Sequence, residues 1–124
     1  MDIRKKEKAV VAALEDIKAR DITAFDVTHL TALFDRVIIA TVDSARQGRA
    51  LASHVNERLK ALGERVYGTE GGPDSDWILV DMGDVVVHIM QPAAREYYNL
   101  EELWGVPKPR AARKQTRARS ANAS

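Results

Sequence analysis

The chain of 124 residues contains no cysteine. It therefore forms no disulfide bond and carries no thiolate chemistry, and a reducing cytoplasm is its expected location. Its N-terminus also lacks the continuous apolar region of a signal peptide, because residues 1–8 mix acids and bases and lead into an amphipathic stretch. Neither a signal peptide nor a membrane span is predicted. A composition of 45% hydrophobic and 30% charged residues is that of a soluble globular protein, and the length suits one domain.

Acidic residues are missing from the end of the chain. From Pro107 onward there are six Lys and Arg and no Asp or Glu, so this tail carries +6. Removing these six from the 19 bases leaves 13 against all 18 acids, so residues 1–106 carry −5. The composition predicts a folded domain over 1–106 and a basic disordered tail over 107–124. An acidic body favours a basic protein partner over nucleic acid, because phosphate contacts need clustered Lys and Arg.

The most informative stretch is residues 76–104. Two apolar runs rich in Val and Ile, separated by Met82 and Gly83, predict a tight antiparallel β-hairpin. If these two residues form the loop, Trp77 pairs with His88 and alternate side chains share a face. One face is then wholly aliphatic, and we expect helices to cover it. The other face is the expected working surface, and it carries Trp77, Leu79, Asp81, Asp84, Val86, His88 and Met90.

The register depends on the turn. Met82 is poorly suited to the positive φ that a type I′ turn needs, and a slip of one residue would exchange the two faces.

The rest of the chain predicts an α/β domain. Helical periodicity indicates helices over residues 5–20, 45–62 and 93–98. Asp43 or Ser44 can cap the second helix, and Pro92 can begin the third. Apolar runs indicate further strands over residues 21–27, 36–42 and 64–70, while 28–34 remains ambiguous. The sum is a mixed sheet of about five strands with flanking helices, in which the long helix permits a parallel crossover.

The hairpin and the helix after it resemble the closing motif of the Iojap family, the ribosomal silencing factors. The residues that carry this resemblance are 76–81, 83–89, Arg95, Tyr98 and 100–105. It continues upstream in Asp21-Ile22, Asp26-Val27, Ile39-Ala40-Thr41, Ser44-Ala45-Arg46-Gln47 and Glu70-Gly71, and covers residues 7–105. Two positions depart from the family pattern: Val42-Asp43-Ser44 replaces the usual Gly-Thr-Ser, and Arg36 replaces an aromatic or apolar residue.

The resemblance implies a ribosome-binding translation repressor that is not an enzyme and needs no cofactor. Members of this family bind large-subunit ribosomal protein fourteen at the subunit-joining face, and so prevent the small subunit from associating. They slow translation when nutrients are scarce, act in large-subunit maturation, and form homodimers. Their fold is similar to that of nucleotidyltransferases. The basic tail lies outside the family pattern, and either contacts ribosomal RNA or is simply solvated.

The expected partner-binding surface consists of Trp77, Leu79, Asp81, Asp84, His88, Met90, Tyr97, Tyr98 and Trp104. Each group has a structural alternative. Trp77 can pack under a helix and His88 can be a hydrogen-bonded core residue, and the tyrosines can pack the last helix onto the sheet. Asp81 and Asp84 can cap backbone amides at the turn. The alternative function is a metal-dependent nucleotidyltransferase or nucleotide-binding protein that uses these two aspartates with Asp26. The run 71–73 lacks the lysine of a phosphate loop and predicts only a turn.

Overall fold

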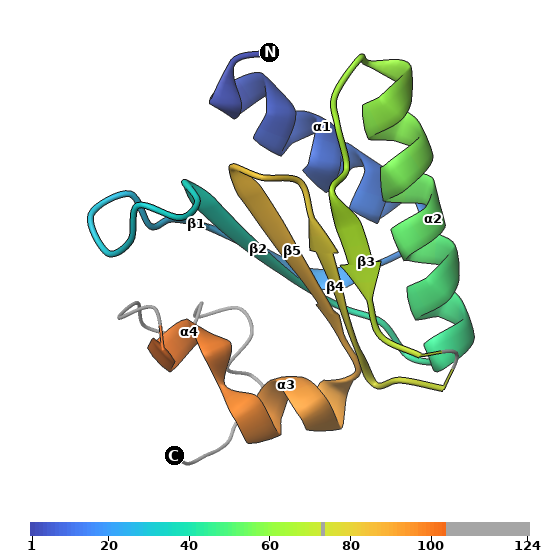
Figure 1. Cartoon of the computed structure of the whole chain (residues 1–124). Helices are drawn as coiled ribbons and strands as arrows, with labels where there is room; N and C mark the ends of the chain where they lie inside the picture. The colour runs from blue at the N-terminus through green and yellow to red at the C-terminus, as the bar shows by residue number, and fades with distance from the viewer. Residues whose placement is uncertain (73, 104–124) are drawn as a thin grey trace.

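The computed structural model describes residues 1–72 and 74–103, which form an α/β domain around one five-stranded mixed sheet (Figure 1). The elements in chain order are α1 (Ile3–Asp16), β1 (Arg20–Asp26), β2 (Arg36–Thr41), α2 (Ala45–Ala61), β3 (Gly68–Glu70), β4 (Trp77–Asp81), β5 (Val85–Met90), α3 (Pro92–Tyr98) and α4 (Leu100–Leu103). The predicted fold class is confirmed. Trp104 and the predicted tail over 107–124 lie outside the described residues.

The strand order in the sheet is β1-β2-β5-β4-β3. Strands β2 and β5 are parallel, whereas the other three pairings are antiparallel. Helix α2 therefore carries the chain from β2 to the opposite edge of the sheet, where β3 pairs with β4. The continuous apolar run of β2 lies at an inner position, and all of its residues except Arg36 are buried, as predicted.

Local signals explain where the helices begin and end. The side chain of Asp2 accepts from the N–H of Arg4 and starts α1 two residues before the predicted range. This helix ends at Asp16, four residues earlier than predicted, because Lys18 takes a left-handed φ of 66°. Ser44 caps α2 as predicted, since its Oγ accepts from the N–H of Gln47 at 3.0 Å.

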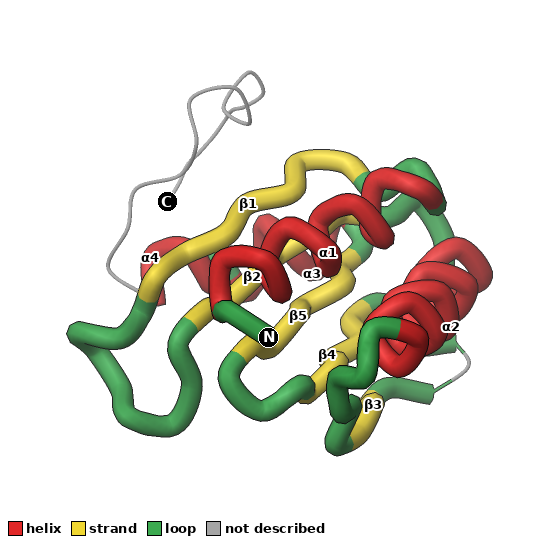
Figure 2. Tube along the Cα trace, turned by 90° about the horizontal axis from the view of Figure 1, so that it is seen from above, coloured by secondary structure: helices red, strands yellow, loops and turns green. Residues whose placement is uncertain are grey.

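The two faces of the sheet are covered differently (Figures 1 and 2). Helices α1 and α2 cover the inner face, where they bury the larger apolar cluster. The predicted aliphatic face of the hairpin lies in this cluster, with Ile78, Val80, Val85, Val87 and Ile89 all buried. A smaller cluster on the outer face is covered by α3 and α4 and contains Phe25, Val27, Val37, Ile39, Met90, Ala94 and Leu100.

The predicted hairpin pairing was wrong by two residues. Trp77 pairs with Met90 rather than with His88, which lies opposite Leu79. The N–H of Met82 donates to the carbonyl of Val85 at 2.9 Å, so the loop is Gly83-Asp84. The physical reason is that this turn needs a residue with positive φ, and Gly83 provides it at 85°. Because the displacement is an even number of residues, each side chain of the two strands keeps its predicted face.

One other prediction needs correction, and one segment that the sequence left ambiguous can be assigned. Of the predicted strand over 64–70, only Gly68–Glu70 pairs with the sheet. The ambiguous segment 28–34 forms turns rather than a helix, with the N–H groups of Leu30 and Thr31 both donating to the carbonyl of Val27. Leu30 and Leu33 are 50% and 81% exposed, so this loop presents apolar side chains to solvent.

Candidate functional site

The outer face of β4 and β5 continues into α3. We define the recognition face as the exposed and half-buried side chains of this region: Trp77, Leu79, Asp81, His88, Tyr97 and Tyr98. Strand alternation brings the first four of them to one side of the hairpin. Pro92 then begins a helix directly after β5, which places the two tyrosines beside the strands.

Aromatic rings form a continuous cluster on the recognition face. The indole Nε1–H of Trp77 donates to Nδ1 of His88 at 3.0 Å. The Trp77 and Tyr98 ring centroids lie 4.6 Å apart, and Tyr97 meets Tyr98 edge-on at 5.0 Å. Tyr97 is 81% exposed and Tyr98 49% exposed. Trp77 and His88 are both half-buried, so this hydrogen-bonded pair packs against the sheet and still reaches the surface.

Burial changes the ionisation of the imidazole. It lowers the pKa of His88 from 6.5 to about 4, because the charged ring would lose its hydration there. The ring is therefore neutral at physiological pH. Its Nδ1 accepts a hydrogen bond from a group that can only donate, which is consistent with this neutral form.

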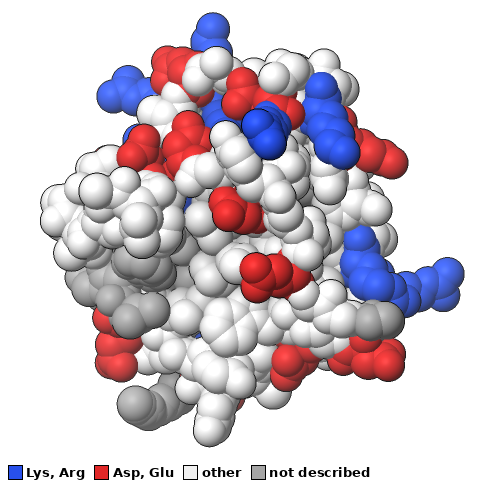
Figure 3. Space-filling view, in the orientation of Figure 1, with Lys and Arg blue, Asp and Glu red and all other residues white. Residues whose placement is uncertain are grey.

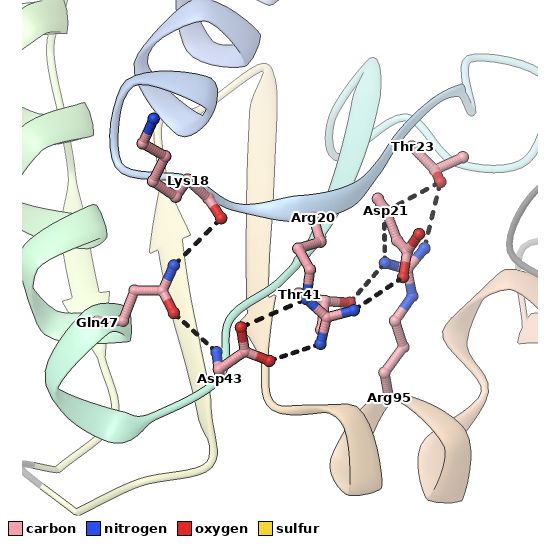
Figure 4. Close-up of polar contacts among 8 residues, drawn as sticks. All are labelled: Lys18, Arg20, Asp21, Thr23, Thr41, Asp43, Gln47 and Arg95. Atoms are coloured by element: carbon pink, nitrogen blue, oxygen red, sulfur yellow. Dashed lines mark hydrogen bonds and ion pairs between the residues drawn. The ribbon is translucent and has the colours of Figure 1, made fainter.

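Helix α3 is held against the strands by Arg95 (Figure 4). Its guanidinium donates to the carbonyl of Asp21, to Oγ1 of Thr41 at 2.9 Å and to Oγ1 of Thr23 at 3.2 Å. These bonds connect α3 to β1 and β2, so the position of Tyr97 and Tyr98 depends on them. A planar group with five donors suits this role better than an ammonium.

A second polar group lies beside Arg95 at the start of α2 (Figure 4). Gln47 donates to the carbonyls of Ile17 and Lys18 and accepts from the N–H of Asp43. The Asp43 carboxylate pairs with Arg20 at 2.6 Å, and this hydrogen bond lowers the pKa of Asp43 below its usual range. Asp43, which lies in the segment that departs from the family pattern, is thus paired with Arg20 of β1.

Each of the three aspartates of the alternative function has its own partner. Asp81 accepts from the N–H of Gly83 at 2.9 Å, which confirms the amide-capping interpretation for this residue. That interpretation is wrong for Asp84, whose carboxylate pairs with Lys6 at 2.6 Å. Asp26 accepts from Thr28 at 2.7 Å. Over residues 1–72 and 74–103, no three His, Asp or Glu side chains gather closely enough to hold a metal ion.

Met90 also lies differently from its expected role. Its side chain is fully buried in the outer cluster beneath Ala94, so it supports the recognition face from below. Trp104, the last residue of the expected surface, lies beyond the part of the chain that the structure describes.

The recognition face is hollowed at two places. A groove of about 560 Å³ is lined by Leu33, Phe34, Tyr67, Leu79, Asp81, Gly83, Val86 and His88. A smaller hollow of about 280 Å³ is lined by Glu70, Gly71, Trp77, Leu79 and His88. Leu79 and His88 line both. In Figure 3 the middle of the molecule is mostly uncharged with a few acidic groups, and Lys and Arg lie towards the edges.

Comparison with known proteins identifies the family. The family profile "Ribosomal silencing factor during starvation" matches residues 1–124. The chain belongs to the ribosomal silencing factor family. A ribosomal silencing factor from Chromobacterium violaceum is 51% identical over 109 residues, covering 88% of this chain and 89% of that protein. One from Haemophilus influenzae is 42% identical and covers 77% and 93%, respectively. A crystal structure from Chromobacterium violaceum matches at a TM-score of 0.84 and 51% identity, covering 88% of this chain and 91% of that one.

Membership of the ribosomal silencing factor family makes the chain a ribosome-associated regulator of translation. The family is regulatory rather than enzymatic. None of the helices in the described residues is both long enough and apolar enough to cross a bilayer.

Sequence reasoning missed one wall of the groove. Leu33, Phe34 and Tyr67 come from two loops outside the hairpin, and Tyr67 is 60% exposed. The adjacent apolar residues Leu33 and Phe34 were the available sequence signal, but these two residues also fit a helical turn. The loop reaches the hairpin because the N–H groups of Asp35 and Arg36 both donate to the carbonyl of Asp84.

Proposed function

We propose that the recognition face binds large-subunit ribosomal protein fourteen and so prevents the small ribosomal subunit from joining. The observation that carries this proposal is the exposed aromatic cluster of Trp77, Tyr97 and Tyr98 beside an apolar groove. Trp and Tyr dominate the binding energy of protein interfaces, because they bury much apolar area while keeping a polar group. Apolar area gathered in one patch, as with these two tyrosines at 81% and 49% exposure, is typical of an interaction surface.

Charge supports a basic partner. Residues 1–106 carry −5, and the exposed Asp81 and Glu70 border the two hollows of the recognition face. Ribosomal proteins are basic, so acidic groups at the rim would speed association and orient the partner. The effect of these rim charges falls with added salt, whereas the aromatic contacts are affected much less.

The mechanism is steric occlusion. A factor bound at the joining face and a docked small subunit exclude one another, so repression follows from mass action alone. No reaction and no cofactor is required, and the site of action is the cytoplasm, where translation takes place. Slowing of translation under nutrient limitation would follow from a higher ratio of factor to large subunits.

The six bases of the tail support an additional contact with ribosomal RNA. Truncation after residue 106 should then weaken binding and reduce its dependence on salt, because fewer counterions are released. The resemblance also implies a homodimer, which sedimentation equilibrium of the free protein tests directly.

The decisive experiment is cosedimentation of the purified protein with separated ribosomal subunits and with a reassociation mixture. We expect binding to the large subunit and a loss of the associated ribosome peak as protein is added. Trp77→Glu should abolish both effects, and Tyr97→Ala should weaken binding about tenfold or more. Leu62→Ala is the matched control, because Leu62 is 46% exposed at the end of α2, away from the recognition face.

Circular dichroism and urea unfolding must show that each variant is folded. Unchanged cosedimentation of folded Trp77→Glu would remove the recognition face from the proposal. Failure of the wild-type protein to bind either subunit would reject the proposal as a whole. Calorimetry with a nucleotide and Mg²⁺ would then test the alternative function.

A further inference from the structure

We propose that His88 is a specificity-determining residue of the recognition face: Trp77 fixes its tautomer, and its Nε2–H donates a hydrogen bond to a carbonyl oxygen of the bound protein. The identity of that protein rests on the function proposed above. The tautomer does not, because it follows from contacts within this chain.

The first step concerns the proton on the imidazole. The indole N–H of Trp77 is a donor only, and it points at Nδ1 of His88 at 3.0 Å. Nδ1 must therefore present its lone pair and carry no proton. In a neutral imidazole the single proton is then on Nε2, so Nε2 is a donor.

The second step is that the ring remains neutral. Burial holds the pKa of His88 at about 4, well below physiological pH. Protonation would place an N–H on Nδ1 against the N–H of Trp77, and that hydrogen bond would be lost. Geometry and burial therefore favour the same form of the ring.

The third step is that Nε2 remains available. Within the described residues, the only hydrogen bond recorded for the His88 side chain is the one at Nδ1. Nε2 is not buried without a partner, so it keeps contact with solvent. The ring lines both hollows of the recognition face, so a bound chain in either hollow comes within its reach. A donor that no intramolecular acceptor uses at such a place is suited to a ligand.

The fourth step defines the acceptor. Leu79 lies opposite His88, and Val86 lies next to it on the same face of β5, so the surroundings of the ring are apolar. A hydrogen bond formed there is shielded from water and correspondingly stronger. Asp81 lies two residues from Leu79 on this face and repels a carboxylate. A neutral carbonyl, from the backbone or an amide side chain of a protein segment in the groove, is the acceptor that fits.

The tautomer can be measured directly in the free protein. A long-range ¹H–¹⁵N spectrum of ¹⁵N-labelled wild-type protein at pH 7 distinguishes a protonated from an unprotonated ring nitrogen. We expect His88 to show an unprotonated Nδ1 and a protonated Nε2. A protonated Nδ1, or a rapid mixture of the two tautomers, would overturn the inference without any assay of binding.

The donor role requires the bound state. In a complex of labelled protein with isolated ribosomal protein fourteen, the Hε2 proton of His88 should become visible through slowed exchange with water. An Hε2 proton that still exchanges rapidly in a saturated complex would contradict the donor role.

Two variants separate the two ring nitrogens. In His88→Asn the amide oxygen can replace Nδ1 as acceptor for Trp77, but nothing replaces Nε2–H. In His88→Gln the amide can reach the position of Nε2. We expect His88→Asn to weaken binding about tenfold, the effect of one lost hydrogen bond, and His88→Gln to bind more tightly than His88→Asn.

The outcomes are distinguishable. If wild-type protein binds and folded His88→Asn binds equally well, the donor role fails and the proposed function stands. If wild-type protein does not bind, the proposed function and the donor role fail together, and the tautomer is decided by the spectrum alone. Urea unfolding of both variants shows whether a loss of binding reflects a loss of folded protein.

Discussion

The ammonium of Lys6 lies 2.6 Å from the carboxylate of Asp84 and joins the first helix to the turn of the β4–β5 hairpin. The same ammonium donates to the carbonyl of Met82 at 2.9 Å and lies 3.3 Å from Glu64. Two hydrogen bonds and a further ion pair thus compensate for the burial of a lysine that is only 4% exposed.

Lys6→Met should lower the free energy of unfolding by about 2–4 kcal/mol. Methionine keeps the apolar volume, but the Met82 carbonyl and the Asp84 carboxylate lose their donor, while Glu64 retains its pairing with the N-terminal amine. Arg20→Met is the matched control, because it removes a cation from the exposed Arg20–Asp43 pair and should cost about 1 kcal/mol or less. Urea unfolding of both variants gives the comparison. If both variants lose the same unfolding free energy, burial of the Lys6 ion pair adds nothing to stability.

Gly71→Ala should destabilise the protein more than Gly63→Ala. Both glycines have positive φ, 128° and 82°, so both substitutions introduce backbone strain. A Cβ at Gly71 would also lie 3.0 Å from the Trp77 carbonyl oxygen and 3.2 Å from the Cα of Ile78, whereas at Gly63 it meets nothing within 4 Å. We expect a cost of about 1 kcal/mol at Gly63 and about 2–3 kcal/mol at Gly71. Thermal or urea unfolding of both variants tests this prediction. A larger loss of stability for Gly63→Ala than for Gly71→Ala would contradict it.

Arg95→Lys should cost about 1–2 kcal/mol of stability and also weaken large-subunit binding. A lysine ammonium cannot reach Asp21, Thr23 and Thr41 in the fixed geometry of a guanidinium, so α3 loses part of its connection to the strands. Hydrogen exchange should show faster opening of residues 92–98 than in the wild-type protein. Arg58→Lys, in an exposed pair with Asp16, is the control and should leave exchange in α3 unchanged.

Stability should fall as the pH is lowered from about 6.5 to about 4. His88 has its ordinary pKa near 6.5 when unfolded and about 4 when folded, so within this window the unfolded chain binds more protons. The contribution is fully present above pH 6.5, and up to about 3 kcal/mol of it is lost by pH 4. Asp16, Asp26 and Asp43 have lowered pKa values, so their contributions are lost only as the pH falls through and below 3.8.

The control for this pH dependence is His88→Asn. It retains the other two histidines, so the difference in unfolding free energy between wild type and variant isolates residue 88. That difference should change between pH 7 and pH 4. A constant difference across the window would show that the folded protein does not hold His88 neutral.

Local chemistry made much of the fold predictable. Ser44 and Pro92 mark the beginnings of two helices, and the alternation in 76–90 assigns each side chain to a face. The pairing of the hairpin was not predictable in the same way, because Met82-Gly83 and Gly83-Asp84 both fit a two-residue loop. Only the geometry shows that Gly83, with its positive φ, takes the first position.

The candidate site was less accessible to sequence reasoning. Periodicity places Met90 on the correct face but does not reveal that α3 covers it. Lys6, the partner of Asp84, is 78 residues away in sequence. A lysine in a charged amphipathic helix is expected at the surface rather than in a buried ion pair. Contacts of this kind depend on how separate elements dock, so neither spacing nor composition records them.

The even displacement of the hairpin pairing has a consequence for its tolerance of errors. A slip of the pairing by two residues leaves every side chain of β4 and β5 on its side of the sheet. A slip of β4 by one residue would instead turn Trp77 towards the helices and Ile78 towards water. The register of this hairpin is therefore constrained against odd-numbered slips far more than against even ones.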